Sequence, residues 1–267
     1  MAFSGSHFRY WTIQYDTPVR QRRLDCRSAD PYLYSIADAF PGALHVRTTR
    51  EELVREYRQQ GWWSDTRITD LFDAAARSAP SQLAVLDPPN RDALVGGSPL
   101  RLTFTDVADL ADGYSLRLLE LGLKRDDILV TQLPNVAEYP ALYLAALRLG
   151  IIVSPVPMQF RRHELEQIVD LTGARALLTV HTRKGAAYAT SAVARGQTRP
   201  LQVLCLGADA PEGSLPFVAA ALTPQSRAAL AAHVDALQAS ADDVATICWT
   251  SGTEGLPKGV PRTHNHW

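Results

Sequence analysis

The sequence predicts an α/β fold in which a mostly parallel sheet carries helices on both faces. Two patterns support this prediction. Short apolar runs alternate with longer segments of helical periodicity from about residue 105 onward, and such alternation is typical of right-handed βαβ crossovers. The apolar runs, for example residues 128–130, are almost continuous, as expected for strands that are buried on both sides.

The composition is that of a globular protein with a large core. The chain has 267 residues, of which 46% are hydrophobic and 21% charged, and its formal net charge is −1. No basic stripe with interleaved aromatic residues suggests a nucleic-acid partner, and no apolar run approaches the roughly 18 residues that span a bilayer. The cysteines Cys26, Cys205 and Cys248 form no CxxC pair, so neither a zinc site nor a disulfide framework is indicated. We therefore expect a cytoplasmic protein, and the N-terminus lacks the apolar core of a secretory signal.

Residues 1–60 are predicted to form an extension that contains one short helix. Three prolines interrupt the first 47 residues, which are either an arm packed on the main body or a partly ordered tail. A helix is predicted over residues 50–60, because Thr48 or Thr49 can cap its start and Gly61 follows its end. The paired tryptophans that come next, Trp62 and Trp63, are predicted to be packing anchors.

The main domain is predicted to span residues 61–267 and to begin with a helix and a hairpin. Thr69 or Asp70 opens the helix, and Pro80 ends it. Two strands are separated by residues that favour turns, so we expect them to pair as a hairpin with a long loop. They cover residues 83–86 and 100–104.

Alternating helices and strands fill the rest of this domain. A helix over residues 106–121 is predicted to be capped by Thr105 and stopped by Gly122. The same periodicity rules predict the remaining elements. The strands are expected at residues 128–133, 151–154, 176–180, 202–206 and 244–249, and the helices at residues 136–149, 162–171, 185–195 and 224–238.

The residues that follow the last strand form a phosphate-binding pattern. They run Thr250, Ser251, Gly252, Thr253, Glu254, Gly255, Leu256, Pro257, Lys258, Gly259. Glycines let backbone N–H groups turn toward an anion, hydroxyls add donors, and a lysine adds charge. The pattern is not a Walker A loop, which needs Ser or Thr directly after its lysine. In parallel sheets ligands bind beyond the carboxyl ends of the strands, and this glycine-rich segment (residues 250–259) starts at such an end.

The glycine-rich segment resembles the phosphate-binding signature of the adenylate-forming superfamily, which includes acyl-CoA synthetases, aryl-acid AMP ligases, luciferases and nonribosomal-peptide adenylation domains. Glu254 stands where many members carry a second Thr, and it replaces a hydroxyl donor by a group that only accepts. Stretches similar to other family motifs occur at residues 102–127, 133–135 and 147–157. Residues 57–63 also resemble the initial segment of members that act on free carboxylic acids.

The resemblance implies an ATP-dependent carboxylic acid–CoA ligase. Such an enzyme converts an acid and ATP into acyl-AMP and pyrophosphate, and then forms the thioester with CoA. By this resemblance Thr250 also contacts Mg²⁺, and the phosphates of ATP are held by Thr250, Ser251, Gly252, Thr253, Glu254, Gly255 and Lys258. Two alternatives stay open: an aryl-acid AMP ligase that passes the acyl group to a carrier protein, and a non-catalytic half-domain that binds a nucleotide or a partner.

The same resemblance predicts that this chain is an N-terminal portion. Family members are much longer, and their acid pocket, adenine and ribose contacts and catalytic lysine follow the glycine-rich segment, so no catalytic residue is expected before Trp267. We expect the chain to end inside a helix that follows this segment and to leave an unpaired sheet edge. His264 and His266 lie one residue apart without a third ligand nearby, and we expect an incidental pair rather than a metal site. Cys205 and Cys248 fall in predicted strands and are expected to be buried, inert thiols.

Overall fold

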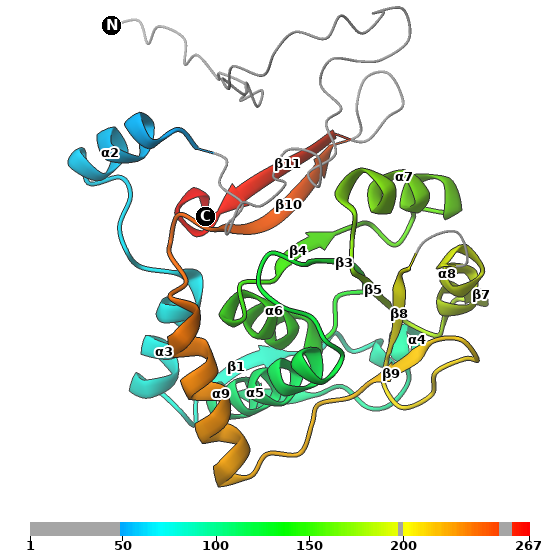
Figure 1. Cartoon of the computed structure of the whole chain (residues 1–267). Coiled ribbons are helices and arrows are strands. Elements are labelled where there is room, and N and C mark those ends of the chain that lie inside the picture. Colours follow the sequence, from blue (N-terminus) through cyan, green and yellow to red (C-terminus); the bar gives the residue numbers. More distant parts are fainter. Residues whose placement is uncertain (1–48, 197–199, 251–257) are drawn as a thin grey trace, which may run out of the picture.

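Seven strands form the central sheet of the molecule (Figure 1). The computed structural model describes residues 49–196, 200–250 and 258–267, and the arm or tail predicted before residue 48 lies outside them. In the described part of the chain the strand order is β11-β10-β4-β3-β5-β8-β9. The strands are β3 (Ile128–Gln132), β4 (Ile152–Pro155), β5 (Ala176–Thr179), β8 (Gln202–Leu206), β9 (Leu215–Phe217), β10 (Val244–Thr250) and β11 (Lys258–Thr263).

The sheet is parallel from β10 to β9, and β11 runs antiparallel beside β10. The central strand β3 is buried along its whole length. Its residue Leu129 lies opposite Val153 of β4 on one side and Ala176 of β5 on the other. Strands buried on both sides need apolar side chains on both faces, and the continuous apolar runs in the sequence supply them. The predicted mostly parallel α/β fold is confirmed.

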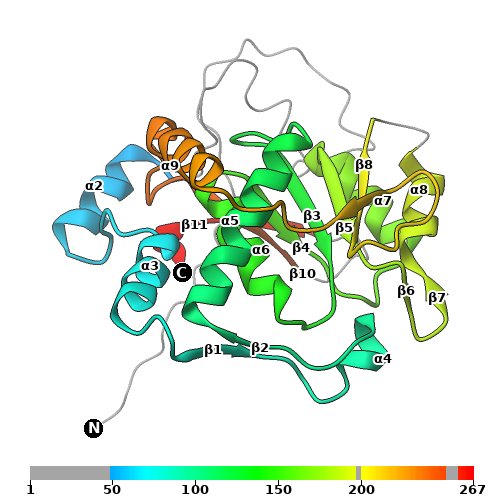
Figure 2. The same cartoon turned by 90° about the horizontal axis from the view of Figure 1, so that it is seen from below.

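Helices cover both faces of the sheet (Figures 1 and 2). On one face Leu129 belongs to a core cluster with Leu118 and Leu142, and on the other Val130 packs with Ile168. Figure 2, which views the molecule from below, shows the helices over Phe104–Glu120 and Glu138–Arg148 side by side in front of the sheet, with the helix over Pro224–Leu237 next to the first of them. The helices are α5 (Phe104–Glu120), α6 (Glu138–Arg148) and α9 (Pro224–Leu237) on the first face, and α7 (Arg162–Thr172) and α8 (Tyr188–Gly196) on the second.

The predicted hairpin before α5 is present as a separate two-stranded antiparallel sheet. Its long loop contains a short helix that the sequence did not predict. This helix is held by the buried carboxylate of Asp87, which accepts hydrogen bonds from Arg91 (2.7 Å) and from the backbone of Leu100 (2.9 Å). Arg91 also binds Glu138 at the start of α6. The elements here are α2 (Glu51–Gln59), α3 (Ile68–Ser78), β1 (Leu83–Leu86), α4 (Arg91–Val95) and β2 (Arg101–Thr103).

Several predicted helix starts were wrong by one to three residues. The hydroxyl of Thr103, not of Thr105, accepts from the backbone of Asp106 and caps α5, while Thr105 donates to the Pro80 carbonyl instead. The reason is reciprocal capping, since the Asp106 carboxylate also accepts from the Thr103 backbone at 2.8 Å. Likewise α2 begins after Arg50 without a side-chain cap, and α3 begins at Ile68.

Two edge strands were not predicted. The segment around Pro216 was expected to be loop, yet it forms β9, where Phe217 is fully buried and stacks on Tyr114 with 5.0 Å between ring centroids. The chain after the glycine-rich segment was expected to be helical, yet it forms β11 and the short 3-10 helix η1 (His264–His266). Both strands contain a proline, which is tolerated where one side of a strand has no ladder partner. A small hairpin of β6 (Thr182–Arg183) and β7 (Ala186–Ala187) also precedes α8.

Candidate functional site

The β10–β11 hairpin brings the two described ends of the glycine-rich segment together. Thr250 is the last residue of β10, Lys258 is the first of β11, and the two are directly paired across the strands. Of the predicted phosphate-binding residues, these two are described. The others lie outside the described residues: Ser251, Gly252, Thr253, Glu254 and Gly255.

Thr250 and Lys258 present a hydroxyl and an ammonium group on one face of the hairpin. Residues directly opposite in an antiparallel pair have their side chains on the same side, with Cβ atoms roughly 5 Å apart. Both residues are exposed. Since β10 is parallel to β4, the pair lies at the carboxyl edge of the parallel strands, where ligands bind in folds of this class. The arrangement suits an anion that approaches this edge.

A close contact between Trp249 and Gly259 sets the shape of this hairpin. The two residues are cross-strand partners, and a Cβ on Gly259 would lie 3.0 Å from both the Trp249 ring and a methyl group of Ile247. The indole nitrogen of Trp249 in turn donates to Oγ of Ser154 on β4 at 2.8 Å. A side chain at position 259 would therefore crowd the Trp249 ring and Ile247, and both would have to move by a few tenths of an ångström to admit it.

Polar side chains also gather at the carboxyl ends of the central strands, but they bind one another and the backbone. Thr131 and Gln132 of β3 and Thr179 of β5 are buried. The Thr131 hydroxyl lies 2.7 Å from the hydroxyl of Tyr139, the Gln132 amide donates to the carbonyls of residues 157 and 160, and Thr179 donates to the Gln132 carbonyl. These buried groups stabilise the edge of the sheet, whereas Thr250 and Lys258 are exposed there.

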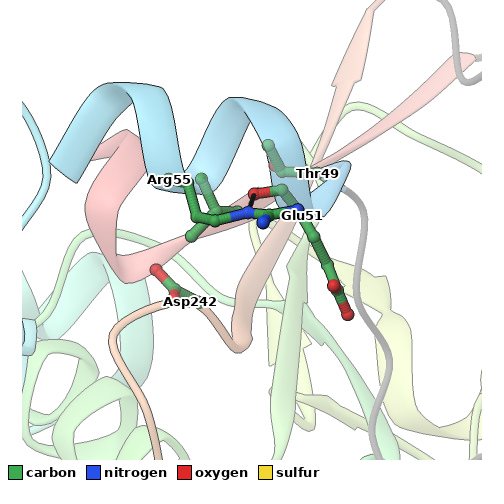
Figure 3. A pocket seen from close by; sticks show the side chains of 5 residues that line it. Thr49, Glu51, Arg55 and Asp242 are labelled. Carbon is green, nitrogen blue, oxygen red and sulfur yellow. Dashed lines mark hydrogen bonds between the residues drawn. The ribbon is translucent and has the colours of Figure 1, made fainter. Parts of the chain in front are cut away.

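The pocket shown in Figure 3 lies at the other end of β10. It is lined by Thr49, Glu51, Val54 and Arg55 around α2, and by Asp242 just before β10. Residues 242 and 250 are separated by roughly 25 Å of extended chain, so this pocket is not part of the Thr250–Lys258 site. A second, more apolar pocket lies beside Asn135, which follows β3.

His264 and His266 take structural positions in η1. The Nδ1 atom of His264 accepts from the backbone of Ile68 at 3.3 Å, and burial lowers the pKa of His264 to about 4. The Nδ1 atom of His266 accepts from the backbone of Thr263 at 3.0 Å, and burial likewise lowers the pKa of His266. Both rings are therefore neutral near pH 7 and act as hydrogen-bond acceptors.

The thiols differ in their surroundings. Cys205 is fully buried in β8, and burial raises the pKa of its thiol to about 11, which makes it a poor nucleophile as predicted. Cys248 of β10 is partly buried, not fully buried as expected.

Trp249 and Asn265 make contacts in and near this hairpin that the sequence did not reveal. The sequence placed Trp249 in a strand but gave no sign that it would lie opposite Gly259, ten residues later. The amide of Asn265 binds Ser64, a partner 201 residues away, and no local pattern indicates such a contact.

A model of the family described as AMP-binding enzyme matches residues 81–267. The chain is 29% identical over 219 residues to the 2-hydroxy-7-methoxy-5-methyl-1-naphthoate–CoA ligase of Streptomyces carzinostaticus, a match that covers 80% of this chain and 38% of that relative. It is 28% identical over 228 residues to the medium-chain fatty-acid–CoA ligase of Escherichia coli K12, covering 82% and 37%. Other relatives are named as AMP ligases for salicylate or 2,3-dihydroxybenzoate.

The fold also matches that of the apo structure of MbtA from Mycobacterium smegmatis. The TM-score is 0.63 at 24% sequence identity, over 84% of this chain and 38% of that one. The chain thus spans less than two fifths of the length of the proteins compared here. No helix in the described ranges is long and apolar enough to cross a membrane. With the family model matching most of its length, the chain belongs to the AMP-binding enzymes, the family of adenylate-forming ligases.

Proposed function

We propose that the natural full-length protein that carries this sequence activates a carboxylic acid with ATP and transfers the acyl group to CoA. The observation that carries the proposal is the pairing of Thr250 with Lys258 at the carboxyl edge of the sheet, in a chain that belongs to the AMP-binding family. Relatives named as CoA ligases of a naphthoate and of medium-chain fatty acids support CoA as the acceptor.

The proposed reaction consists of two nucleophilic displacements. An oxygen of the acid forms a bond to the α-phosphorus of ATP while the bond from that phosphorus to its bridging oxygen breaks, and pyrophosphate leaves. The sulfur of CoA then attacks the acyl carbon, loses its proton, and expels AMP. In the first step Lys258 and the Thr250 hydroxyl would hold the β- and γ-phosphates and stabilise the negative charge on the departing pyrophosphate, which is catalysis by positioning and electrostatics.

The residues predicted between Thr250 and Lys258 belong to the same proposal. Ser251 and Thr253 would add hydroxyl donors, Gly252 and Gly255 would admit the phosphates close to the backbone, and Glu254 would stand beside them. Among the described residues no group of three or more His, Cys, Asp or Glu side chains could hold a metal ion by itself. The Thr250 hydroxyl therefore fits Mg²⁺ that arrives with ATP, because Mg²⁺ takes few protein ligands when phosphates supply the others.

The test is exchange of labelled pyrophosphate into ATP, measured on the full-length protein with a panel of aliphatic and aromatic acids. Lys258→Ala should lower the exchange rate on the order of 100-fold, the loss expected for one electrostatic contact in a transition state. The chain offers a matched control, because its other lysines are Lys124 and Lys184. Lys124 is exposed and precedes β3, at the amino edge of the sheet, and Lys124→Ala should leave the rate unchanged. An unchanged rate in Lys258→Ala would show that the role assigned to Lys258 is wrong.

An aryl-acid AMP ligase that passes its acyl group to a carrier protein is the second candidate, and relatives with salicylate and dihydroxybenzoate ligase names favour it. Offering CoA and a phosphopantetheinylated carrier protein side by side distinguishes the two, since one of them should form the thioester. If the full-length protein shows neither exchange nor thioester with any acid, a non-catalytic domain that binds a nucleotide or a partner is the better description. The boundary predicted near residue 60, between an extension and the main domain, stays part of this proposal.

A further inference from the structure

The side chain of Asn265 joins the end of the described chain to its N-terminal part. Its Oδ1 accepts from the backbone N–H of Ser64 at 3.1 Å, and its Nδ2 donates to the Ser64 carbonyl at 3.0 Å and to Oδ1 of Asp242 at 2.8 Å. Both amide protons are used, so the side chain is held in a single orientation. Residues 64 and 265 are thereby fixed to each other.

Aromatic packing and an ion pair strengthen the same junction. Trp63 is 8% exposed, and its ring lies edge-on to His266 with 5.0 Å between centroids and to Tyr57 with 5.2 Å. Arg58 of α2 binds Asp242 at 3.0 Å, the same carboxylate that receives Asn265. Figure 1 shows α2 and the C-terminal turn at the same end of the sheet. Residues 57–64, which we name the N-terminal brace, thus pack directly on η1.

One end of β11 leads into this junction. In the part of the chain that the structure describes, β11 is the edge strand and has β10 as its only sheet neighbour. One end of β11 is Lys258, and the other leads into η1, where Thr263 donates to His266. The ends of an edge strand are where local opening costs least. Ser64 and Trp63 of the N-terminal brace contact Asn265 and His266, which directly follow this end of β11.

We propose that the N-terminal brace is a positioning element of the nucleotide site. By fixing Asn265 and His266 it sets the placement of β11, and through β11 it keeps Lys258 opposite Thr250. This inference rests on the proposed function for the choice of ATP as the ligand. Small misplacements of a positioning group are costly in such sites, because binding and catalysis depend on distances of about 3 Å. Residues some 190 positions before the Thr250–Lys258 pair would therefore tune the affinity for ATP.

Trp63→Ala tests the proposal, with Trp62→Ala as the matched control. Trp62 is 68% exposed, and it contacts Tyr57 as Trp63 does, but no ring contact joins it to η1 among the described residues. In the 267-residue chain, hydrogen exchange of peptides covering residues 258–267 should become about tenfold faster in Trp63→Ala and stay at the wild-type rate in Trp62→Ala. Peptides from β3 should exchange at the wild-type rate in both, which excludes general unfolding.

The functional readout is made on the full-length protein. Trp63→Ala should raise KM for ATP about three- to tenfold while kcat stays within about twofold, and Trp63→Phe should restore most of the affinity. If Trp63→Ala folds poorly, the milder change Arg58→Gln can be used instead, and it should also raise KM for ATP. Wild-type exchange in residues 258–263, an equal effect of Trp62→Ala, or an unchanged KM for ATP would overturn the proposal. Absence of pyrophosphate exchange in the wild-type protein would refute the proposed function instead, and hydrogen exchange would still decide whether the brace holds β11.

Discussion

The indole nitrogen of Trp249 donates a hydrogen bond to Oγ of Ser154 at 2.8 Å, and so joins the last parallel strand to its neighbour β4. The same indole covers Gly259 on β11. One side chain therefore connects three adjacent strands at the edge where the glycine-rich segment begins, and the hairpin depends on its position.

Gly259→Ala should destabilise the chain by about 1–3 kcal/mol, because the added methyl group would lie only 3.0 Å from the indole and from Ile247, and interiors resist overpacking. Urea unfolding measures this change. Trp249→Phe removes two of the three atoms that lie nearest to a Cβ at position 259. In this background Gly259→Ala should therefore lower the free energy of unfolding by less than half as much. Equal costs in both backgrounds would show that the contact with Trp249 is not the cause.

Asp87→Asn should lower the free energy of unfolding by about 2–4 kcal/mol at pH 7. An amide has a single acceptor oxygen, so its NH2 group must face either the backbone N–H of Ala137 or the donors Arg91 and Leu100. Although burial opposes ionisation, hydrogen bonds from Leu100 and Arg91 lower the pKa of Asp87 below its ordinary value. A lowered carboxyl pKa stabilises the fold above the unfolded pKa of about 4 and loses this effect as the pH falls. The gap between wild type and variant should therefore close below about pH 4. Asp92→Asn, at an exposed position of α4, is the control and should stay within about 0.5 kcal/mol.

His264 should make the protein less stable in mild acid. Burial lowers its pKa from 6.5 to about 4, so between these values the unfolded chain takes up a proton that the folded chain refuses. Stability is therefore fully present above about pH 6.5 and falls by about 2–3 kcal/mol toward pH 4. His264→Asn keeps an acceptor for Ile68 but does not titrate, and its stability should fall less over this range. His163→Asn changes an exposed histidine and should follow the wild type. The measurement is the free energy of unfolding as a function of pH. Parallel curves for the wild type and His264→Asn would show that His264 is not the source of the loss of stability in acid.

Thr103→Ala should cost about 1 kcal/mol, the usual value for the loss of an N-terminal helix cap. Thr103→Ser keeps the hydroxyl that accepts from the backbone of Asp106, so its free energy of unfolding should be close to that of the wild type. Thermal or urea unfolding of the two variants measures the difference. A serine variant as unstable as the alanine variant would mean that the methyl group, and not the cap, supplies the stability.

The central strands could be predicted because their own residues determine them. β3, β4, β5 and β8 each contain a run of consecutive apolar residues, which is typical of parallel strands that are buried on both sides. β9 and β11 could not be predicted in this way. Pro216 and Pro261 argue against a strand locally, yet both are accommodated because an edge strand pairs on one side. Their strand structure comes from the neighbours β8 and β10.

The candidate site, too, could be predicted from the sequence only in part. The residue types of the glycine-rich segment indicate an anion site from the sequence alone, whereas the pairing of Thr250 with Lys258 requires the hairpin, which the sequence did not predict. The fit of Gly259 against Trp249 and the contact of Asn265 with Ser64 depend on distances between segments. Such contacts follow from the folded sheet and not from local periodicity.

The direct pairing of Thr250 with Lys258 has a consequence for engineering. Thr250 and Lys258, on either side of residues 251–257, are paired in the sheet, so we expect the ladder to tolerate connections of different length. The entropic cost of closing such a connection grows only slowly with its length, by about 0.6 kcal/mol for each doubling. We therefore expect that the corresponding segments of other family members can be grafted between Thr250 and Lys258. The nucleotide preferences of the resulting chimaeras could then be compared in an otherwise unchanged protein.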